Sequence, residues 1–418
     1  MNVIYIHQYF NMPAMSGSTR SFEMGRRFVA SGHEVNIITS LRDCNQIYDD
    51  WFETEEAGIK VHWFPVPYSN NMSFMQRIRA FLLFARAARQ KAGELAGDVI
   101  FATSTPLTIA LPAVSVAHEK KIPMVFEVRD LWPEMPIAMG ALNNPLLRFA
   151  ARRLERWAYK NAAAVVALSP GMKGGVVATG YPAEKVAVIP NSSDNLEFAY
   201  DAEAARQFRA ARAWLGNKPL LVYTGTFGKV NGVGYMVGLA SALQARRSDV
   251  RILLVGDGAE LDTVKQSARK AGVYKNNLFI EERIPKKDIP SLLSAASVAT
   301  NLVIDIPEAR ANSANKFFDT LAAGKPVFLN HGGWMHDLVT SHECGLPMWQ
   351  KSVDEVAEVL DAKLHDPVWL EKAGAAAREL AEEFFDRDVL AGQLMAVLQS
   401  AVEGEPGNAA KIAPGKYA

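Results

Sequence analysis

Two charged side chains, Lys316 and Asp319, lie on one short predicted helix within the segment from Ala311 to Pro326. Lys316 would bring a full positive charge to the first turn of this helix. Asp319 could accept hydrogen bonds from hydroxyl groups. The free backbone N–H groups and the positive dipole end of a helix start favour phosphate. Phosphate at one end and a polyol beyond it would together make a sugar nucleotide; the alternative is an ordinary capped helix of an α/β fold.

Flanking residues predict where this helix begins and ends. Asn312 or Ser313 is suited to cap its first turn, and Gly324 to supply the left-handed residue after its last turn. Asn315 follows at the start of the helix. Asn312, Ser313 and Asn315 are therefore predicted to face the ligand, and the apolar residues 327–329 predict a buried strand.

A glycine-rich loop, 224–232, follows another predicted strand and carries a second lysine, Lys229. It is neither a Walker loop nor a dinucleotide-binding fingerprint. Gly228 would let a phosphate approach the backbone, and Lys229 would add charge; the alternative for Lys229 is a solvated loop lysine. Gly256 forms a tight turn after the next strand, and Ile284 precedes a helix where the backbone could contact a nucleotide base.

Arg129 and Asp130 follow an apolar strand in the segment FEVRDLWP, residues 126–133. Ionisable groups at such a place are costly unless they are used or paired. Asp130 could hold or deprotonate an acceptor hydroxyl, whereas a buried structural pair with Arg129 is the alternative. His7, at the end of the first strand, is a second candidate, although a satisfied strand-end histidine explains it equally well.

Gly17 and Arg20 belong to the turn 15–20, which follows the first strand and opens a helix that runs from 21 to about 30. Small residues in such a turn let a ligand approach the backbone at the helix start. Gly17 and Arg20 are therefore predicted to join His7 and Arg129 in binding the acceptor.

Apolar runs alternate with helical patterns along the chain, which predicts βαβ units and parallel sheets covered on both faces. The rhythm restarts after a polar stretch from Asn191 to Asn217, which predicts two doubly wound, Rossmann-like domains facing a cleft. Ligands in such sheets lie beyond the carboxyl ends of the strands. The predicted strands are 3–6, 35–38, 61–64, 99–101, 124–126 and 165–167 in the first domain, then 220–223, 251–255, 278–280, 298–300 and 327–329 in the second.

The domain boundaries are predicted at 1–195 and 196–385, and a last helix, 386–403, is predicted to pack back on the first domain. The Gly-, Pro- and Ala-rich tail, 404–418, is predicted to be flexible. The triplet Asp386-Arg387-Asp388 is similar to a metal-binding pattern of some sugar transferases. A helix cap at Asp386 is the favoured alternative.

Composition places the 418-residue chain among soluble globular proteins, and its formal net charge of zero gives no reason to expect a nucleic-acid partner. Cys44 and Cys344 are too few and too far apart for a disulfide framework, which favours a reducing cytoplasm. The first ten residues predict a strand and lack the features of a signal peptide. No apolar run is long enough to span a bilayer.

The helix predicted from Phe74 to Lys91 interleaves arginines with apolar residues, and Leu83 and Phe84 fall outside its main apolar stripe. Exposed apolar groups beside arginines suit an anionic membrane surface. A second basic helix runs from Leu146 to Lys160. The sequence therefore predicts a cytoplasmic protein peripheral to the inner face of a membrane; two ordinary amphipathic helices packed on the sheet are the alternative.

Taken together, these segments resemble family 4 glycosyltransferases of the GT-B fold over nearly the whole chain. Arg129 to Pro133 together with Asn315 to Asp319 is similar to the branch containing N-acetyl-L-fucosamine transferases of O-antigen and capsule assembly. The other matching segments are SGHEV at 31–35, LSPGM at 168–172, AVIPNSSD at 187–194, LVGDG at 254–258 and LAAGKP at 321–326.

This resemblance implies a UDP-sugar donor on the second domain, a lipid-linked glycan acceptor on the first, and retention of anomeric configuration without a metal or other cofactor. Lys316 and Lys229 would stabilise phosphate charge, together with backbone N–H groups near Ser313 and Gly228. Asp319 would hold the ribose, while Ile284 would contact the base.

The chain departs from the family pattern at three positions. A pair of Glu residues is common in the family; here the second position is Asp319 and the first is Ala311. The Arg and Lys of the first phosphate loop correspond to Thr226 and Asn231, which leaves Lys229 out of register. Losing a carboxylate that binds sugar hydroxyls fits a donor with fewer hydroxyls, such as a deoxy amino sugar.

Two other functions remain open for this sequence. A sugar-nucleotide epimerase of the same fold would consume the donor without an acceptor. A non-catalytic protein that binds sugar nucleotides or lipid-linked glycans would fit the missing Glu and basic residues.

Overall fold

The computed structural model describes residues 1–15, 17–42, 50–69 and 72–417, which form two compact units. The first unit contains Met1–Pro190 and Asp388–Lys416, and the second contains Asn191–Arg387 and Tyr417. The chain thus divides after Pro190 instead of at the predicted 195. The reason is local: the backbone N–H of Asn191 donates to Ser313 Oγ at 3.1 Å, which ties the segment after Pro190 to the second unit.

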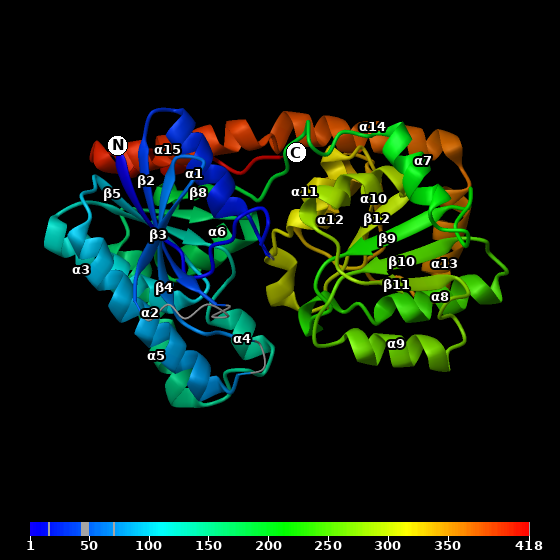
Figure 1. The fold of residues 1–418 in the computed structure, drawn as a ribbon, viewed down its shortest axis with the longest axis horizontal. Helices are drawn as coiled ribbons and strands as arrows, with labels where there is room; N and C mark the ends of the chain where they lie inside the picture. Colours follow the sequence, from blue (N-terminus) through cyan, green and yellow to red (C-terminus); the bar gives the residue numbers. More distant parts are fainter. Residues whose placement is uncertain (16, 43–49, 70–71, 418) are drawn as a thin grey trace. The chain divides into compact units, whose positions relative to one another are not determined.

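An eight-stranded sheet forms the centre of the first unit, in the order β3-β4-β2-β1-β5-β6-β7-β8 (Figure 1). Its neighbouring strands are parallel except for the antiparallel pair β3 and β4. The strands are β1 (Asn2–Ile6), β2 (Glu34–Leu41), β3 (Phe52–Glu56), β4 (Ile59–Pro65), β5 (Val99–Thr103), β6 (Met124–Val128), β7 (Ala164–Ala167) and β8 (Val186–Val188).

Helices cover both faces of this sheet, as the βαβ rhythm predicts. They are α1 (Arg20–Ala30), α2 (Phe74–Glu94), α3 (Ala110–Lys120), α4 (Glu134–Ala138), α5 (Pro145–Asn161), α6 (Pro170–Ala178), α15 (Arg387–Val402) and α16 (Ala409–Ile412), with the short turns η1 (Leu107–Ile109), η2 (Ala183–Lys185) and η6 (Pro406–Asn408). Helices α2 and α5 both contact α3 and η1.

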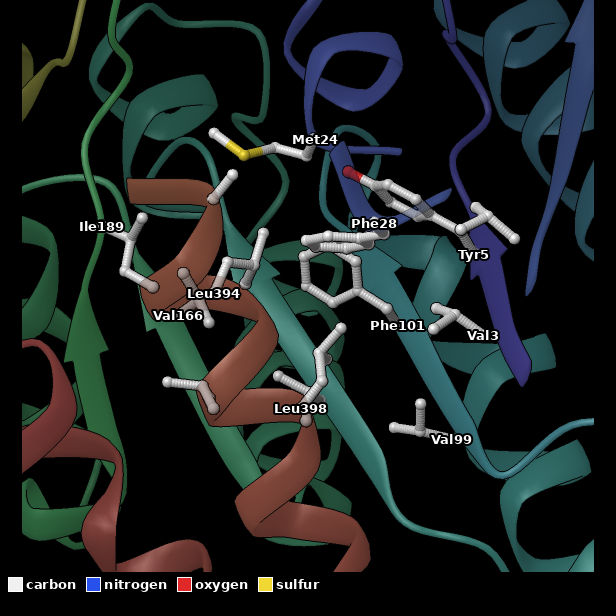
Figure 2. Packing of buried hydrophobic residues seen from close by; sticks show 14 of the residues in the cluster. Val3, Tyr5, Met24, Phe28, Val99, Phe101, Val166, Ile189, Leu394 and Leu398 are labelled. Carbon is white, nitrogen blue, oxygen red and sulfur yellow. The ribbon is translucent and has the colours of Figure 1, made fainter. Parts of the chain in front are cut away.

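One face of the sheet is buried under α1 and the C-terminal helix α15 (Figure 2). Side chains of a strand alternate between faces, so every second residue of β1 enters this core. The packed side chains include Val3 and Tyr5 of β1, Phe101 of β5, Val166 of β7, Met24 and Phe28 of α1, and Leu394 and Leu398 of α15.

The predicted flexible tail instead contains a short helix that packs on the first unit. Ala409 and Ala413 are each 1 % exposed and belong to the same apolar core. The backbone N–H of Val188 donates to the carbonyl of Ala413 at 2.9 Å, so the tail extends the hydrogen bonding at the edge strand β8. The small alanine side chains let this segment pack closely on the first unit. Its Gly-, Pro- and Ala-rich composition is typical of a flexible tail, which is why the prediction was wrong.

The second unit is built on a parallel six-stranded sheet in the order β11-β10-β9-β12-β13-β14 (Figure 1). Its strands are β9 (Leu220–Thr224), β10 (Arg251–Val255), β11 (Leu278–Glu281), β12 (Val298–Asn301), β13 (Val327–Leu329) and β14 (Gly345–Pro347). The helices are α7 (Ala202–Ala210), α8 (Tyr235–Ala245), α9 (Leu261–Lys270), α10 (Ile289–Ala295), α11 (Asn315–Ala322), α12 (Trp334–Ser341), α13 (Val353–Leu364) and α14 (Pro367–Phe384). The short turns are η3 (Lys229–Asn231), η4 (Lys286–Asp288) and η5 (Pro307–Ala311).

Apolar clusters cover both faces of the second sheet as well. Leu221 and Tyr223 of β9 enter the cluster formed with α8, α9 and α13, whereas Leu220 and Val222 enter the one on the opposite face. The prediction of two doubly wound α/β domains is therefore confirmed. The cleft between them stays a prediction.

Candidate active site

Lys316 lies in the first turn of α11, and its amine is buried at the carboxyl end of β9. The Nζ atom is 4.1 Å from the centroid of the Tyr223 ring. Among the described residues, no hydrogen-bond acceptor contacts Nζ. Burial lowers the pKa of Lys316 from 10.5 to about 7. An amine held in this way is poised for an anion, because an anion would restore the stabilisation that water no longer gives.

Gly225 makes room for this amine. A Cβ atom at Gly225 would lie 2.7 Å from Lys316 Nζ, and the residue has a φ of +138° that side chains rarely adopt. The first glycine after β9 therefore lets α11 bring its lysine against the β9 loop. The glycines of this loop are plain in the sequence, whereas their contact with Lys316 depends on the fold.

Thr226 and Asn231, at the positions where the family resemblance expects Arg and Lys, shape this loop. Tyr223 Oη donates to the carbonyl of Thr226 at 2.7 Å, and Asn231 Nδ2 donates to the same carbonyl at 2.9 Å. Lys229 is exposed on η3. The buried cation at the end of β9 is thus supplied from α11.

Gly228 and Gly256 lie in the loops after β9 and β10. Gly228 precedes η3 and accepts a backbone hydrogen bond from Asn231 at 3.0 Å. A Cβ at Gly256 would come 1.9 Å from the carbonyl oxygen of Gly225. Gly256 is therefore required for packing the β9 and β10 loops together; its predicted contact with a donor stays a prediction.

Asn312 and Ser313 do not cap α11, contrary to the sequence prediction. The N-cap of α11 is Ala314, and no side chain accepts a hydrogen bond there. Asn312 Nδ2 donates to the carbonyl of Ala309 at 2.7 Å, and Ser313 Oγ accepts from Asn191. Asn312 thus bonds within the loop before the helix and Ser313 bonds to the distant Asn191, so the first turn of α11 has no side-chain cap.

The other end of α11 matches the prediction. Gly324 has a φ of +61°, and its N–H donates to the carbonyl of Leu321 at 2.9 Å. Asn315 is the first residue of α11 and is partly exposed.

Asp319 lies one turn after Lys316 on α11 and is partly buried. Burial raises the pKa of the Asp319 carboxyl, while the positive charges of Lys286 and Arg387 oppose that shift. Lys286 and Arg387 thus work against burial and favour the ionised carboxylate, which could accept hydrogen bonds from a ligand's hydroxyls.

Ala311 ends η5, a turn held by three neighbouring side chains. Arg310 donates to Asp305 at 2.8 Å, and its guanidinium lies 4.7 Å from the ring centroid of Trp349. Trp349 Nε1 also donates to Asp305, at 3.3 Å. Asp305 is thus engaged with both Arg310 and Trp349.

Ile284 is partly buried and packs against an apolar cluster that includes Phe279 and Leu292. This contact fixes the segment between β11 and α10. Its predicted contact with a nucleotide base stays a prediction.

In the first unit, Arg129 follows β6 and is oriented by two elements. Arg129 Nη2 donates to Ser18 Oγ at 2.8 Å, and Nη1 lies 3.3 Å from His7 Nε2. His7 Nδ1 is 2.9 Å from Ser21 Oγ. Burial, and then the charge of Arg129, lower the pKa of His7. His7 is therefore a neutral acceptor toward Arg129 and a support for its orientation.

Asp130 lies beside Arg129 and is partly buried. Burial raises the pKa of its carboxyl, against the effects of Arg129 and of a hydrogen bond from Thr105. Thr105 Oγ1 lies 3.4 Å from Asp130 Oδ2. The structure thus brings His7, Arg129 and Asp130 together at the carboxyl ends of β1 and β6, as parallel strands require.

The prediction that Arg20 binds the acceptor is wrong, because the residue is buried in a structural ion pair. It is 5 % exposed, and its Nε donates to Glu127 at 2.9 Å. Its Nη1 and Nη2 donate to the carbonyls of Pro190 and Ile189, at 2.6 and 3.0 Å. Glu127 is fully buried and also accepts from Thr103 Oγ1 at 2.6 Å. Arg20 joins α1, β6 and the end of β8, and its guanidinium is not presented to an acceptor.

Gly17 is exposed and has a φ of +132°; a Cβ there would lie 2.5 Å from Asn11 Nδ2. Asn11 Nδ2 donates to the carbonyl of Ser18 at 3.3 Å. Gly17 therefore closes the turn that positions Ser18. Ser16, in the same predicted turn, lies outside the described residues.

Four residues of these two sites are not among the predicted site residues: Tyr223, Gly225, Ser18 and Thr105. Tyr223 and Gly225 lie at or just after the end of a predicted strand and Ser18 in the predicted turn 15–20, which are the signals that the sequence offers. Their partners come from distant segments, and only the folded chain shows which strand ends meet.

Asp386, Arg387 and Asp388 are directed to separate partners. Asp386 accepts from Asn195 Nδ2 at 3.2 Å, Arg387 pairs with Asp194, and Asp388 pairs with Arg27. Within the described part of the chain, no group of three or more His, Cys, Asp or Glu side chains is arranged to hold a metal ion. The prediction that no metal is needed stays a prediction.

Basic helices α2 and α5 both expose apolar side chains. On α5, Leu146 is 77 % and Phe149 is 67 % exposed; on α2, Leu82 and Leu83 are each about half exposed. Phe84 is 1 % exposed, so it belongs to the core, contrary to its predicted place outside the apolar stripe. The side chain of Phe74 lies outside the described residues.

In the described ranges, no helix combines the length and apolar character that crossing a bilayer requires. Cys344 is buried, whereas Cys44 lies outside the described residues.

Comparison with known proteins gives two family matches in series. Residues 17–192 match the glycosyl transferase 4-like domain, and residues 205–380 match glycosyl transferases group 1. A curated relative is the GDP-mannose-dependent alpha-(1-6)-phosphatidylinositol monomannoside mannosyltransferase of Mycobacterium tuberculosis. It is 23 % identical over 305 residues, which is 71 % of this chain and 74 % of the relative.

Two solved structures share the fold over almost the whole chain. Sucrose-phosphate synthase from Thermosynechococcus elongatus has a TM-score of 0.78 at 16 % identity, covering 96 % of this chain and 99 % of that one. Anabaena HepE in complex with UDP has a TM-score of 0.70 at 16 % identity, covering 96 % of this chain and 100 % of that one. With two consecutive glycosyltransferase domains on two Rossmann-like units, the chain belongs to the family 4-like, group 1 glycosyltransferases of the GT-B fold and is a glycosyltransferase enzyme.

Proposed function

We propose that this enzyme transfers a deoxy amino sugar from a UDP-sugar to a lipid-linked glycan in the assembly of a bacterial surface polysaccharide. The observation that carries the donor half is the buried amine of Lys316 at the end of β9, which has no hydrogen-bond acceptor among the described residues. A diphosphate would favour the protonated amine, balance its positive charge and accept its hydrogen bonds. Asp319, one turn further along α11, would accept hydrogen bonds from the ribose.

Phosphate stabilisation is the main chemical task in this proposal. When the sugar leaves, negative charge builds on the diphosphate, and a fixed cation stabilises that charge without needing to reorganise. Lys316 would act from its buried position and Lys229 from the exposed η3. The departing diphosphate would help to accept the acceptor's proton, and the sugar would keep its anomeric configuration.

UDP is proposed as the donor nucleotide. HepE binds UDP in its solved structure, which supports this choice, while the mycobacterial relative is named for GDP-mannose. The sugar is proposed from Ala311, which replaces a carboxylate expected to bind sugar hydroxyls. Fewer hydroxyls on the donor would leave fewer unmet hydrogen bonds at that position.

The acceptor half rests on Asp130 and Arg129. Asp130 would hold or deprotonate the attacking hydroxyl, and Arg129 would bind an anionic group of the acceptor. Because His7 and Ser18 orient Arg129, its guanidinium is already directed before an acceptor arrives.

A lipid-linked acceptor would be met at a membrane surface on the cytoplasmic side. The exposed Leu146 and Phe149 on α5 lie on the same helix as exposed Arg152, Arg153 and Arg156. Apolar side chains that enter the interface beside arginines favour anionic lipid. We therefore propose that α5, in addition to α2, contacts the membrane.

Thermal unfolding with a panel of UDP-, GDP- and dTDP-sugars tests the donor assignment. A ligand that binds the folded state raises its stability by mass action. We expect the largest rise with a UDP-sugar and a loss of that rise in Lys316→Met. A larger shift with GDP-mannose than with any UDP-sugar would overturn the proposed nucleotide. Equal turnover of UDP-glucose and a UDP-deoxy amino sugar would overturn the proposed sugar.

Turnover assays separate the enzyme from its alternatives. Conversion of a UDP-sugar without any acceptor would indicate an epimerase. Inactivity with every donor and acceptor, despite donor binding, would favour a non-catalytic binding protein. Proton NMR of the product's anomeric centre would test retention.

A further inference from the structure

Thr105 has an unusual backbone conformation for its residue type. It follows β5 and has a φ of +85°, although a side chain branched at Cβ strongly disfavours positive φ. The other non-glycine residues with positive φ in the described ranges have values from 50° to 61° and carry no branch at Cβ. Backbone strain of this kind costs on the order of 1–3 kcal/mol and tends to be retained at functional sites.

The hydroxyl of Thr105 lies against the carboxylate of Asp130. Oγ1 lies 3.4 Å from Asp130 Oδ2, at the long end of the hydrogen-bond range, which is common for catalytic groups before a substrate tightens the site. The neighbouring Ser104 Oγ accepts the backbone N–H of Arg129 at 2.9 Å. Two consecutive hydroxyl residues after β5 therefore contact the Arg129–Asp130 pair. Ser104 binds the backbone of Arg129, and Thr105 binds the carboxylate of Asp130.

We propose that Thr105 is a positioning residue that fixes the Asp130 carboxylate, so that Oδ2 is occupied by the threonine hydroxyl and Oδ1 is left for the acceptor hydroxyl. This inference rests on the proposed role of Asp130 in binding the acceptor. It assigns to the loop after β5 a part in orienting the reacting hydroxyl.

The charges around Asp130 determine what the Thr105 hydroxyl does. Burial favours the neutral carboxylic acid, whereas Arg129 and the hydroxyl of Thr105 favour the ionised form. His7 contacts Arg129 instead of Asp130. Removing the hydroxyl should therefore raise the pKa of Asp130. As the pH is lowered, activity that requires the carboxylate should then be lost at a higher pH than in the wild type.

Thr105→Val tests this inference because it keeps the shape of the side chain and removes the hydroxyl. Thr105→Ser restores a hydroxyl. Thr108→Val is the matched control, since Thr108 is a nearby threonine in η1 whose buried hydroxyl has no hydrogen-bond partner in the described structure. Far-UV circular dichroism and thermal unfolding would establish that all three variants fold.

The first readout does not depend on activity. Titration of carboxyl-13C-labelled aspartate by NMR, with Asp130→Asn to assign the resonance, gives the pKa of Asp130 directly. In Thr105→Val we expect it to rise by about one pH unit, as the loss of a hydrogen bond to a charged group would cause. Thr105→Ser and Thr108→Val should titrate like the wild type. An unchanged Asp130 titration in Thr105→Val would overturn the inference.

The second readout is the pH profile of kcat with a lipid-linked acceptor. The acidic limb should move to higher pH in Thr105→Val and stay in place in Thr105→Ser and Thr108→Val. Wild-type turnover by Asp130→Asn would overturn the proposed role of Asp130 in catalysis. The NMR titration would still decide whether Thr105 fixes the carboxylate, so the two failures can be told apart.

Discussion

Lys316 Nζ lies 4.1 Å from the centroid of the Tyr223 ring, and this contact joins α11 to the end of β9. The electron-rich face of the ring offers the amine a partial replacement for water. It does not offer a hydrogen-bond acceptor, so the cost of burying the charge is only partly offset. The pair therefore holds the Lys316 amine in place while leaving it short of a counter-charge, which is the arrangement a diphosphate site requires.

Replacing Lys316 with Met should lower kcat/KM by about 10²–10³-fold, as the loss of one preorganised charge-stabilising group does elsewhere. Lys229→Met is the matched comparison, because Lys229 is exposed and its charge is screened by water. We expect a loss of about tenfold or less in that variant. Steady-state kinetics at fixed ionic strength would measure both. Equal losses in the two variants would mean that burial gives Lys316 no special role.

Donor binding should be accompanied by proton uptake at pH 8. The pKa of Lys316 is lowered to about 7 in the free protein, so the amine is mostly neutral at that pH. A bound diphosphate favours the charged form and raises the pKa, and about one proton should then be taken up for each UDP bound. Calorimetry in buffers of different ionisation enthalpy would measure the uptake.

Lys316→Met should abolish this uptake, and the wild type should show little of it at pH 6, where the amine is already protonated. The same pKa shift makes the free energy of unfolding rise with pH between about 7 and 10.5, because the unfolded chain binds the extra proton in that window. Uptake that persists in Lys316→Met would assign the proton to another group.

Removing the Glu127 carboxylate should destabilise the first unit strongly. Glu127→Ala leaves the buried Arg20 guanidinium without its partner, and such a loss typically costs about 3–5 kcal/mol. Glu134→Ala is the matched control, since Glu134 pairs with Arg152 at the surface, where water screens the attraction and little stability is lost. Urea unfolding would compare the two. Similar stability in both variants would show that the Arg20–Glu127 pair does not hold α1 to β6.

Placing charge on the exposed apolar face of α5 should weaken membrane binding. Leu146→Glu and Phe149→Glu replace side chains that would enter the lipid interface, so cosedimentation with vesicles containing phosphatidylglycerol should fall. Val368→Glu is the control, because Val368 is 75 % exposed on α14 of the second unit. Binding that is equal in all three variants would refute a membrane contact through α5.

Most of the fold was predictable because its signal is local. Buried parallel strands are short apolar runs, and the predicted runs at 3–6, 99–101 and 251–255 all lie within strands of the structure. Strands β3, β8 and β14 were not predicted. Residues 52–56 are mostly polar because they form an edge strand, and β14 contains Gly345 and Pro347, which are typical of turns.

The sequence by itself determined two doubly wound units and the places where their strands end, since periodicity and glycine positions depend on neighbouring residues. It also determined that Lys316 and Asp319 share one helix that Gly324 ends. Tertiary structure decided which groups meet. It buried Lys316 against Tyr223, set Thr105 against Asp130, and committed Arg20 to Glu127. These pairings join residues far apart in the chain, and burial and hydrogen-bond partners acquire their energetic meaning only when the distant segments are packed together.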